Sequence, residues 1–249
     1  MIVRGRTDIK SAYQDQALAD DYIKARFEDP FGAEFHRQQL ERINRAIQRA
    51  DPRSLLEIAC GPARLTPSLR RVEQSVAVEQ SPAMIARAVE RLRRLGATHW
   101  RLIKGDGFEM PFRDASFDMV VTARFIRHFD RSDRQRLYAG VRRVLRPGGW
   151  LVFDVAHGPA YRWLLNKWGV AGSWVDDYWF ERDEFVAEMR ENGFAVDALD
   201  PVHSYVRLQH YVYSYGHPRL PRLSRALSRS ITRLGSRDAY EWVAVCRRA

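Results

Sequence analysis

Apolar residues follow two different periods along this chain. Short apolar runs, which predict buried strands, alternate with segments whose apolar residues recur every three or four positions, which predict helices. The predicted strands span 54–60, 75–79, 99–104, 117–122, 150–156, 194–199 and 239–248. The predicted helices span 13–28, 33–50, 63–72, 82–95, 132–145 and 181–192. This alternation predicts an α/β fold with a doubly wound, mostly parallel sheet, which binds ligands beyond the carboxyl ends of its strands.

Composition excludes several other classes of protein. The chain has 249 residues, of which 45% are hydrophobic, enough for a sizeable core and too many for a disordered chain. No apolar run reaches the roughly 18 residues of a membrane-spanning helix, and the first residues lack the apolar core of a secretory signal. Two cysteines, Cys60 and Cys246, are too few for a disulfide framework or a zinc-finger site. We therefore expect a cytoplasmic protein with no structural metal.

The loop after the first predicted strand carries the clearest chemistry. It reads Glu-Ile-Ala-Cys-Gly-Pro-Ala-Arg over 57–64. The three glycines of a dinucleotide fingerprint would fall on Ala59, Gly61 and Arg64, and an arginine at the third position opposes the close helix–strand packing that this motif needs. A nicotinamide cofactor is therefore not expected. The spacing of one acid followed by small residues at every second position favours a cofactor that lies directly across the backbone.

This loop resembles motif I of the class I S-adenosylmethionine-dependent methyltransferases, written D/E-x-G-x-G-x-G. Further segments follow in the family's order: Glu79 ends the second strand, Gln80–Met84 resembles D-x-S-x-x-M, Gly105–Phe108 resembles G-D-A, and 146–149 resembles the K-P-G-G element. The resemblance implies S-adenosylmethionine as the cofactor and a Rossmann-like sheet of seven strands with an antiparallel last strand. It implies that Glu79 holds the ribose hydroxyls, that Met84 packs on the adenine and that Asp106 binds the adenine amino group.

The full set of cofactor-binding residues that the resemblance implies is Tyr13, Glu57, Ala59, Gly61, Ala63, Glu79, Gln80, Met84, Asp106, Gly107, Phe108 and Thr122. Ala59 and Ala63 stand where the family has glycine. Because an alanine disfavours the left-handed region, we expect the loop to avoid positive φ at both positions. One methyltransferase domain is expected over 1–249, with a helical cover at 1–50, the cofactor-binding core at 54–156, substrate-side insertions at 158–238 and the last strand at 239–248.

The acceptor side is expected beyond the fourth and fifth strands. His128 follows the fourth strand, and Asp154 and His157 lie at the end of the fifth, so these three are the candidate catalytic residues. Histidine is the side chain that most readily takes a proton near neutral pH, and a base is needed only if the acceptor is a hydroxyl or a similar group. Candidate substrate-binding residues are Tyr22, Arg124, Trp163, Trp168 and Trp174. The many aromatic residues at 158–180 favour a small hydrophobic, aromatic or lipid-linked acceptor, although they also suit a helical cover.

The C-terminal region is basic. The chain carries a net charge of +10, and residues 216–249 hold eight arginines against Asp238 and Glu241. Leucine and isoleucine recur at helical spacing among the arginines of 219–237, which predicts a basic amphipathic helix that either contacts an anionic membrane at the inner face of the cell or packs on the domain. A nucleic-acid methyltransferase is the alternative, but 122–125 lacks the N/D-P-P-Y/F motif that grips a flipped base. A non-catalytic S-adenosylmethionine-binding protein is the second alternative.

Overall fold

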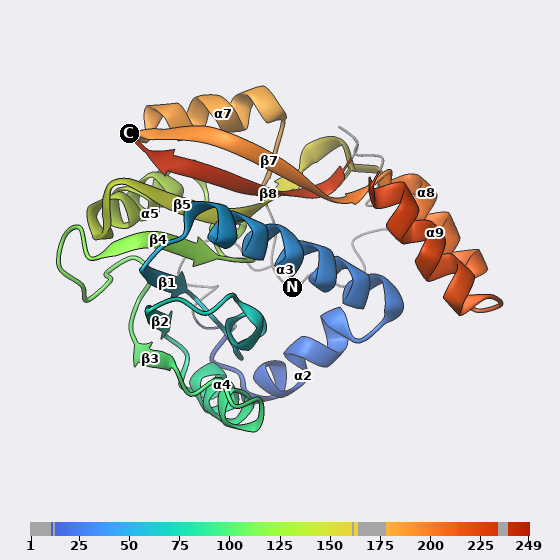
Figure 1. Cartoon of the computed structure of the whole chain (residues 1–249), viewed down its shortest axis with the longest axis horizontal. Helices are drawn as coiled ribbons and strands as arrows, with labels where there is room; N and C mark the ends of the chain where they lie inside the picture. The colour runs from blue at the N-terminus through green and yellow to red at the C-terminus, as the bar shows by residue number, and fades with distance from the viewer. Residues whose placement is uncertain (1–10, 12, 161, 164–177, 234–238) are drawn as a thin grey trace.

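The computed structural model describes residues 11, 13–160, 162–163, 178–233 and 239–249. One sheet runs through the molecule in the order β3-β2-β1-β4-β5-β8-β7, with a short β6 beside β5 (Figure 1). The strands are β1 (Ser54–Ile58), β2 (Gln74–Glu79), β3 (Trp100–Lys104), β4 (Phe117–Thr122), β5 (Leu145–His157), β6 (Trp179–Phe180), β7 (Phe194–Ser204) and β8 (Ala239–Arg248). The pairs from β3 to β5 are parallel, and β8 runs antiparallel to both β5 and β7. The predicted α/β fold is confirmed, and two-residue β6 is added to its seven strands.

Helices cover both faces of the sheet. They are α2 (Gln16–Phe27), α3 (Pro30–Ala50), α4 (Pro82–Arg94), α5 (Arg131–Val144), α7 (Arg182–Glu191), α8 (Val206–Tyr211) and α9 (Pro221–Arg233). Successive side chains of a strand point to opposite faces, so Leu55 belongs to the core with α2, α3 and α4, whereas Leu56 belongs to the core with α5 and α7 (Figure 1). Both leucines are fully buried. None of the described helices is long and apolar enough to cross a membrane.

Caps fix where the helices that border the site begin. The Asp29 side chain accepts from the backbone N–H groups of Phe31 and Gly32 at the start of α3, and Pro30 occupies the first turn. Ser81 caps α4, with Oγ accepting from the N–H of Met84 at 3.3 Å, and Pro82 follows. These caps fix the residues at which α3, after α2, and α4, after β2, begin.

The helix predicted over 63–72 is wrong. Only a 3₁₀ turn forms there, at Thr66–Ser68, and Leu69 is already extended. Pro67 has no N–H to donate to the preceding turn and disfavours helical backbone at the residue before it, so the apolar spacing does not produce an α-helix.

Candidate active site

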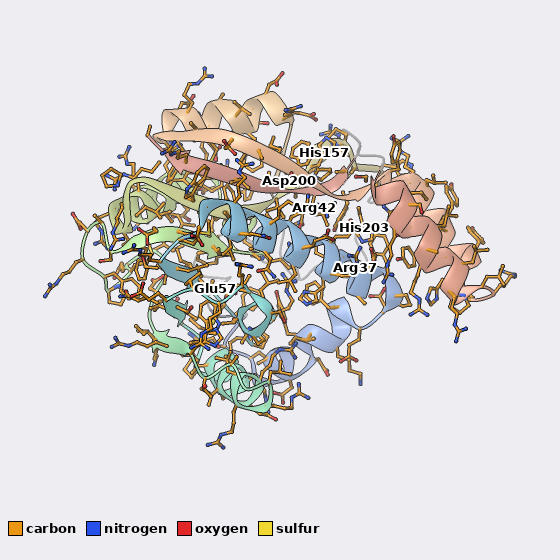
Figure 2. All side chains as sticks on the ribbon, in the orientation of Figure 1. Arg37, Arg42, Glu57, His157, Asp200 and His203 are labelled. Atoms are coloured by element: carbon orange, nitrogen blue, oxygen red, sulfur yellow. The ribbon has the colours of Figure 1, made fainter. Side chains whose placement is uncertain are left out.

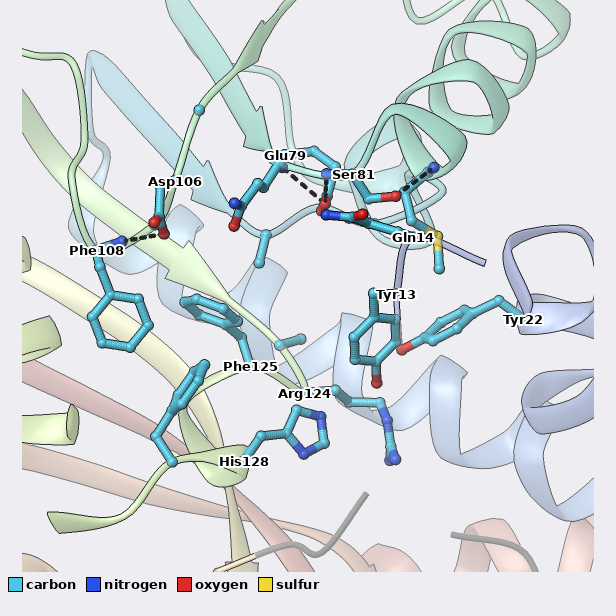
Figure 3. Close-up of a pocket in the computed structure, with 18 residues that line it drawn as sticks. Tyr13, Gln14, Tyr22, Glu79, Ser81, Asp106, Phe108, Arg124, Phe125 and His128 are labelled. Atoms are coloured by element: carbon cyan, nitrogen blue, oxygen red, sulfur yellow. Dashed lines mark hydrogen bonds between the residues drawn. The ribbon is translucent and has the colours of Figure 1, made fainter. Parts of the chain in front are cut away.

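A pocket opens at the carboxyl ends of β1, β2 and β4 (Figure 3). Nine of the predicted cofactor-binding residues line it: Tyr13, Ala59, Gly61, Glu79, Gln80, Met84, Asp106, Gly107 and Phe108. The predicted substrate-binding residues Tyr22 and Arg124 and the predicted base His128 also line it. Residues from five separate segments of the chain therefore meet where a doubly wound sheet is expected to bind its ligand.

Glu79 organises the cofactor end of the pocket. Its Oε2 accepts from the N–H of Gly61 at 2.9 Å, and its Oε1 accepts from the N–H groups of Gln80 and Ser81 at 2.8 Å each (Figure 3). Burial raises the pKa of this carboxyl, and the three backbone hydrogen bonds act in the opposite direction. Each carboxylate oxygen can accept more than one hydrogen bond, so the same group can still receive hydroxyl donors. A buried carboxylate in this position fits the ribose of S-adenosylmethionine.

The loop keeps left-handed backbone where alanine replaces glycine. Ala59 has φ 53° and Ala63 has φ 55°, on either side of Gly61 at φ 57°. The expectation that this loop avoids positive φ at the two alanines is therefore wrong. A left-handed alanine is strained by roughly 1–2 kcal/mol. Two hydrogen bonds hold the loop in this shape: the Cys60 carbonyl accepts from the N–H of Ala63, and the Glu79 carboxylate accepts from the N–H of Gly61. The loop thus has the glycine-type shape without the glycines.

Asp106, Gly107 and Phe108 form the second wall. The Asp106 Oδ1 accepts from the N–H of Phe108 at 3.0 Å. A Cβ at Gly107 would lie 2.9 Å from both Ile58 and the ring of Phe125, so only glycine fits. The Phe108 ring meets Phe129 edge-on, with centroids 4.9 Å apart. The turn therefore presents a carboxylate beside an aromatic wall, which suits a flat heteroaromatic ring.

Tyrosine and histidine rings gather at the opposite end of the pocket. The Tyr13 ring lies 6.2 Å from the ring of Tyr22 and 6.2 Å from that of His128 (Figure 3). Both tyrosines come from the N-terminal segment, while His128 ends the 3₁₀ turn Ile126–His128 after β4. His128 is buried, with only 3% of its surface exposed. A histidine ring from the turn after β4 thus lines the pocket beside two tyrosine rings.

Three predicted cofactor residues do not line the pocket. Glu57 and Ala63 are buried beneath the loop, and the Thr122 hydroxyl donates to the carbonyl of Ile58 at 2.8 Å, tying β4 to β1. Burial raises the pKa of Glu57 to about 7. These residues support the loop and have no contact with the pocket.

Two candidate catalytic residues lie outside the pocket as well. The Nδ1–H of His157 donates to the carbonyl of Ala239 at 2.8 Å, and its ring lies 4.3 Å from that of Trp242, tilted by 38°. His157 is also buried, but in a part of the interior separate from that of Glu57 (Figure 2). Asp154 Oδ1 accepts from the N–H of Arg124 at 2.6 Å, which holds the turn that points Arg124 into the pocket. Asp154 is a positioning residue here, and His157 packs against the last strand.

The tryptophan prediction has a different outcome. The Trp163 ring lies 6.0 Å from the ring of His210, and the guanidinium of Arg207 lies over it at 5.5 Å. Trp163 therefore contacts α8 and does not line the pocket. Trp168 and Trp174 lie outside the described residues. The aromatic wall of the pocket comes instead from Phe108, Phe125 and Phe129.

A buried polar chain behind the site was missed from the sequence. Arg127 Nη1 donates to Asp154 Oδ2 at 2.8 Å and to Glu241 Oε2 at 2.6 Å. Glu241 in turn accepts from Gln39, and Gln39 accepts from Arg64. These contacts join positions up to 202 residues apart, a separation that local sequence patterns do not reveal.

Six further residues line the pocket without having been predicted as site residues: Gln14, Ser81, Gly105, Ala123, Phe125 and Phe129. All six adjoin a predicted site residue in the chain, so extending each predicted position by one residue would have found them. Phe125 and Phe129 lie on either side of the 3₁₀ turn Ile126–His128, which the spacing of apolar residues did not predict.

The chain is similar to known methyltransferases. Residues 56–153 match the family model described as a methyltransferase domain. Demethylmenaquinone methyltransferase of Thermotoga maritima is 28% identical over 181 residues, which cover 63% of this chain and 76% of that protein. The demethylmenaquinone methyltransferase of Tropheryma whipplei is 33% identical over 119 residues, which cover 45% and 48% respectively.

The fold as a whole also has relatives among solved structures. The magnesium protoporphyrin IX methyltransferase of Synechocystis with bound S-adenosylhomocysteine superposes with a TM-score of 0.69 at 11% identity, covering 98% of this chain and 100% of that one. A [4+2]-cyclase superposes with a TM-score of 0.63 at 15% identity, covering 100% and 97%. At these identities the likeness concerns the fold, and the motifs at the pocket carry the family. Residues 56–153 of this chain therefore form a class I S-adenosylmethionine-dependent methyltransferase domain.

Proposed function

We propose that this enzyme methylates a small hydrophobic acceptor, aromatic or lipid-linked, which enters the pocket between the phenylalanine wall and the two tyrosines. The observation that carries the proposal is the packing of that wall. Phe125 meets Phe129 edge-on at 5.0 Å, and both rings line the pocket. Rigid aromatic faces of this kind favour flat apolar ligands, with a few polar groups to orient them.

The polar groups that orient the acceptor are Arg124 and His128. Arg124 lines the pocket with φ 56°, a strained backbone held by the hydrogen bond to Asp154. A guanidinium at this point favours an acceptor oxygen that carries or develops negative charge. His128 takes the proton when the acceptor is a hydroxyl. S-adenosylmethionine supplies the methyl group on a sulfonium, so the protein's main task is to position the two reactants.

The names of similar proteins point in the same direction. They act, by their names, on demethylmenaquinone and on magnesium protoporphyrin IX, and a further relative in Xylella fastidiosa acts on malonyl-[acyl-carrier protein]. Two of these three acceptors contain flat ring systems, which suits an aromatic wall. Contact of 219–237 with an anionic membrane stays a proposal, and it would bring the enzyme close to acceptors dissolved in lipid.

Methyl transfer to a panel of acceptors tests the proposed function. Purified protein is incubated with labelled S-adenosylmethionine and with quinols, phenols, porphyrins, carboxylic acids or RNA. We expect transfer to an apolar ring compound and a loss of transfer in Phe125→Ser, with S-adenosylhomocysteine affinity retained. Transfer to RNA alone would establish the nucleic-acid alternative, and binding of the cofactor with no transfer to any acceptor would favour the non-catalytic one.

A further inference from the structure

Helix α9 buries two of its three serines and exposes its two leucines. Ser224, Ser228 and Ile231 are 4%, 0% and 5% exposed, whereas Leu223 is 61% and Leu227 is 47% exposed. A surface helix normally turns its apolar stripe toward the core. The stripe predicted from the spacing of 219–237 therefore exists, but at Leu223 and Leu227 it faces away from the protein.

Close packing of α9 explains this orientation. The Ser228 Oγ donates to Gln209 Oε1 at 2.7 Å, and a Cβ at Gly216 would lie 2.8 Å from the Ser224 Oγ. Small residues therefore let α9 approach α8 and the π-helical turn Val212–Gly216 that follows it. A leucine in place of either serine would not fit, so the apolar residues have no inward alternative on this side.

Helix α8 and the residues next to it also expose large apolar side chains. Tyr205, Leu208, Tyr211 and Tyr215 are 37%, 50%, 44% and 62% exposed, and the rings of Tyr211 and Tyr215 stack at 6.0 Å. With Leu220, Leu223 and Leu227 they form what we call the α8–α9 surface. Most of the large apolar residues that are exposed in the described part of the chain belong to it. Both helices lie together at one end of the molecule (Figure 1).

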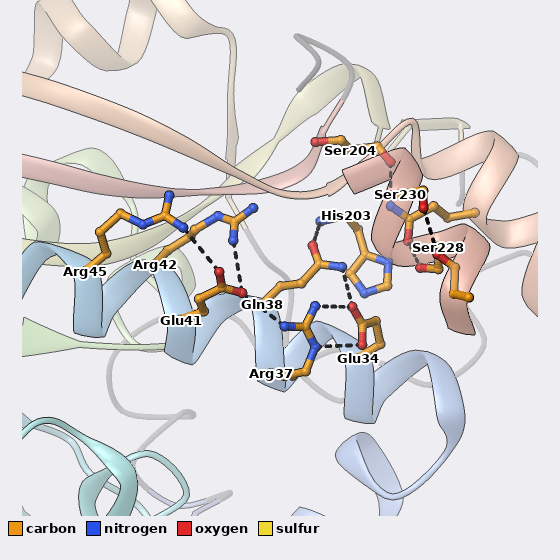
Figure 4. A network of polar contacts seen from close by, with 12 residues as sticks. Glu34, Arg37, Gln38, Glu41, Arg42, Arg45, His203, Ser204, Ser228 and Ser230 are labelled. Atoms are coloured by element: carbon orange, nitrogen blue, oxygen red, sulfur yellow. Dashed lines mark hydrogen bonds and ion pairs between the residues drawn. The ribbon is translucent and has the colours of Figure 1, made fainter. Parts of the chain in front are cut away.

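The charge of the α8–α9 surface has a single sign. Exposed arginines accompany the apolar residues at positions 207, 219, 222, 225 and 229, and the sequence has no acidic residue between Asp200 and Asp238. Glu34, on the helix beside the base of α8 and α9, already has a partner (Figure 4). Glu34 pairs with Arg37 on α3, and Gln38 on the same helix accepts from the N–H of His203, which anchors the end of β7 (Figure 4).

We propose that the α8–α9 surface docks on an anionic lipid bilayer. Leucines would enter the interface, tyrosines would lie at the level of the headgroups, and arginines would pair with lipid phosphates while their apolar stems stay in contact with the acyl boundary. A second copy of the chain fits poorly, since it would bring arginines against arginines. RNA would use the arginines and leave the leucines and tyrosines in water.

Cosedimentation with vesicles tests this docking. The wild-type protein is expected to bind vesicles of phosphatidylcholine and phosphatidylglycerol and to bind pure phosphatidylcholine much less. The double variant Leu223→Asp/Leu227→Asp should bind the mixed vesicles at least about tenfold more weakly, and Arg222→Gln/Arg225→Gln/Arg229→Gln should lose roughly fivefold for each arginine. Since these side chains are exposed, the melting temperature should stay unchanged.

Two variants serve as controls. Val89→Asp changes an apolar residue of similar exposure, 52%, on α4, and it should bind vesicles as the wild type does. Ile231→Asp should lower the melting temperature, because Ile231 is buried on the side of α9 that faces the protein.

Three results would overturn the proposal. They are vesicle binding that is absent or equal for all exposed variants, tight RNA binding that ignores the leucine changes, and a dimer in solution that Leu223→Asp/Leu227→Asp dissociates. Vesicle binding needs no acceptor, so its failure leaves the proposed methyl transfer untouched.

Discussion

Arg127 and Asp154 form an ion pair inside the protein, with Nη1 and Oδ2 2.8 Å apart and side chains only 1% and 2% exposed. The same guanidinium nitrogen also donates to Glu241 Oε2 at 2.6 Å, and the Glu241 side chain is fully buried. One cation therefore compensates two carboxylates. Burial, followed by the charge of Asp154, raises the pKa of Glu241 to about 7, which shows how strongly the three charges depend on one another.

Removing the cation should cost more than removing one carboxylate. Arg127→Met leaves two buried carboxylates facing each other, and we expect the free energy of unfolding to fall by about 3–5 kcal/mol. Asp154→Asn leaves Arg127 paired with Glu241, and we expect a loss of only about 1–3 kcal/mol. Urea unfolding measures both. Arg131→Met, from an exposed pair with Glu191, is the control and should change stability by less than about 0.5 kcal/mol. Equal losses for Arg127→Met and Asp154→Asn would contradict this account.

Glu79→Gln should weaken the binding of S-adenosylmethionine and S-adenosylhomocysteine by roughly 1.5–3 kcal/mol, because an amide offers one acceptor oxygen in place of two and carries no charge. Isothermal titration calorimetry measures the change. Glu73→Gln, at an exposed position before β2, is the matched control. Unchanged affinity in Glu79→Gln would remove the ribose site from Glu79.

His128→Ala should reduce the rate of methyl transfer to a hydroxyl acceptor about 10²–10⁴-fold while cofactor affinity changes little. His157→Ala is the informative comparison. Its imidazole bonds the Ala239 carbonyl outside the pocket, so this variant should lose thermal stability and keep its rate per folded molecule. Full activity in His128→Ala would mean that positioning alone suffices. A rate loss confined to His157→Ala would reverse the two roles.

Glu57 should make stability depend on pH. The unfolded chain releases this proton near pH 4.5 and the folded chain only near 7, so the folded state loses relative stability as the pH rises between the two values. Glu57→Gln lacks this loss. The stability difference between variant and wild type should therefore shift in favour of the variant by about 3 kcal/mol between pH 4 and pH 8. Chemical unfolding across this range tests it, and a difference that does not change with pH would show that Glu57 ionises normally.

Ala59→Gly should stabilise the fold slightly, against the usual effect of this substitution. Relief of the left-handed strain, roughly 1–2 kcal/mol, exceeds the entropic cost of glycine, roughly 0.5–1 kcal/mol. Ala86→Gly, at an exposed position in the middle of α4, should instead cost about 1 kcal/mol. Thermal unfolding of the two variants measures the contrast, and a matching loss at both positions would show that Ala59 is not strained.

Sequence patterns predicted the sheet and nine of the residues that line the pocket, because most of these residues directly follow a predicted strand in the chain. Glu79 and Asp106 lie at or just after strand ends, where local spacing places them. The acceptor side was harder to predict. His128 and His157 follow neighbouring strands and look equivalent in sequence, but only a three-dimensional turn after β4 brings His128 into the pocket. The face of α9 that packs on the protein could not be predicted either, because residue spacing shows an apolar stripe but not whether that stripe is buried.

Gln39 belongs to α3, lines no part of the pocket and is fully buried. Its amide nitrogen donates to Glu241 and its amide oxygen accepts from Arg64, so this one side chain joins the acid behind the acceptor end to the arginine that follows the cofactor loop. A change there would disturb the binding of both reactants together while touching neither. Residues that govern methyl transfer in this enzyme are therefore to be sought in its interior as well as in its pocket.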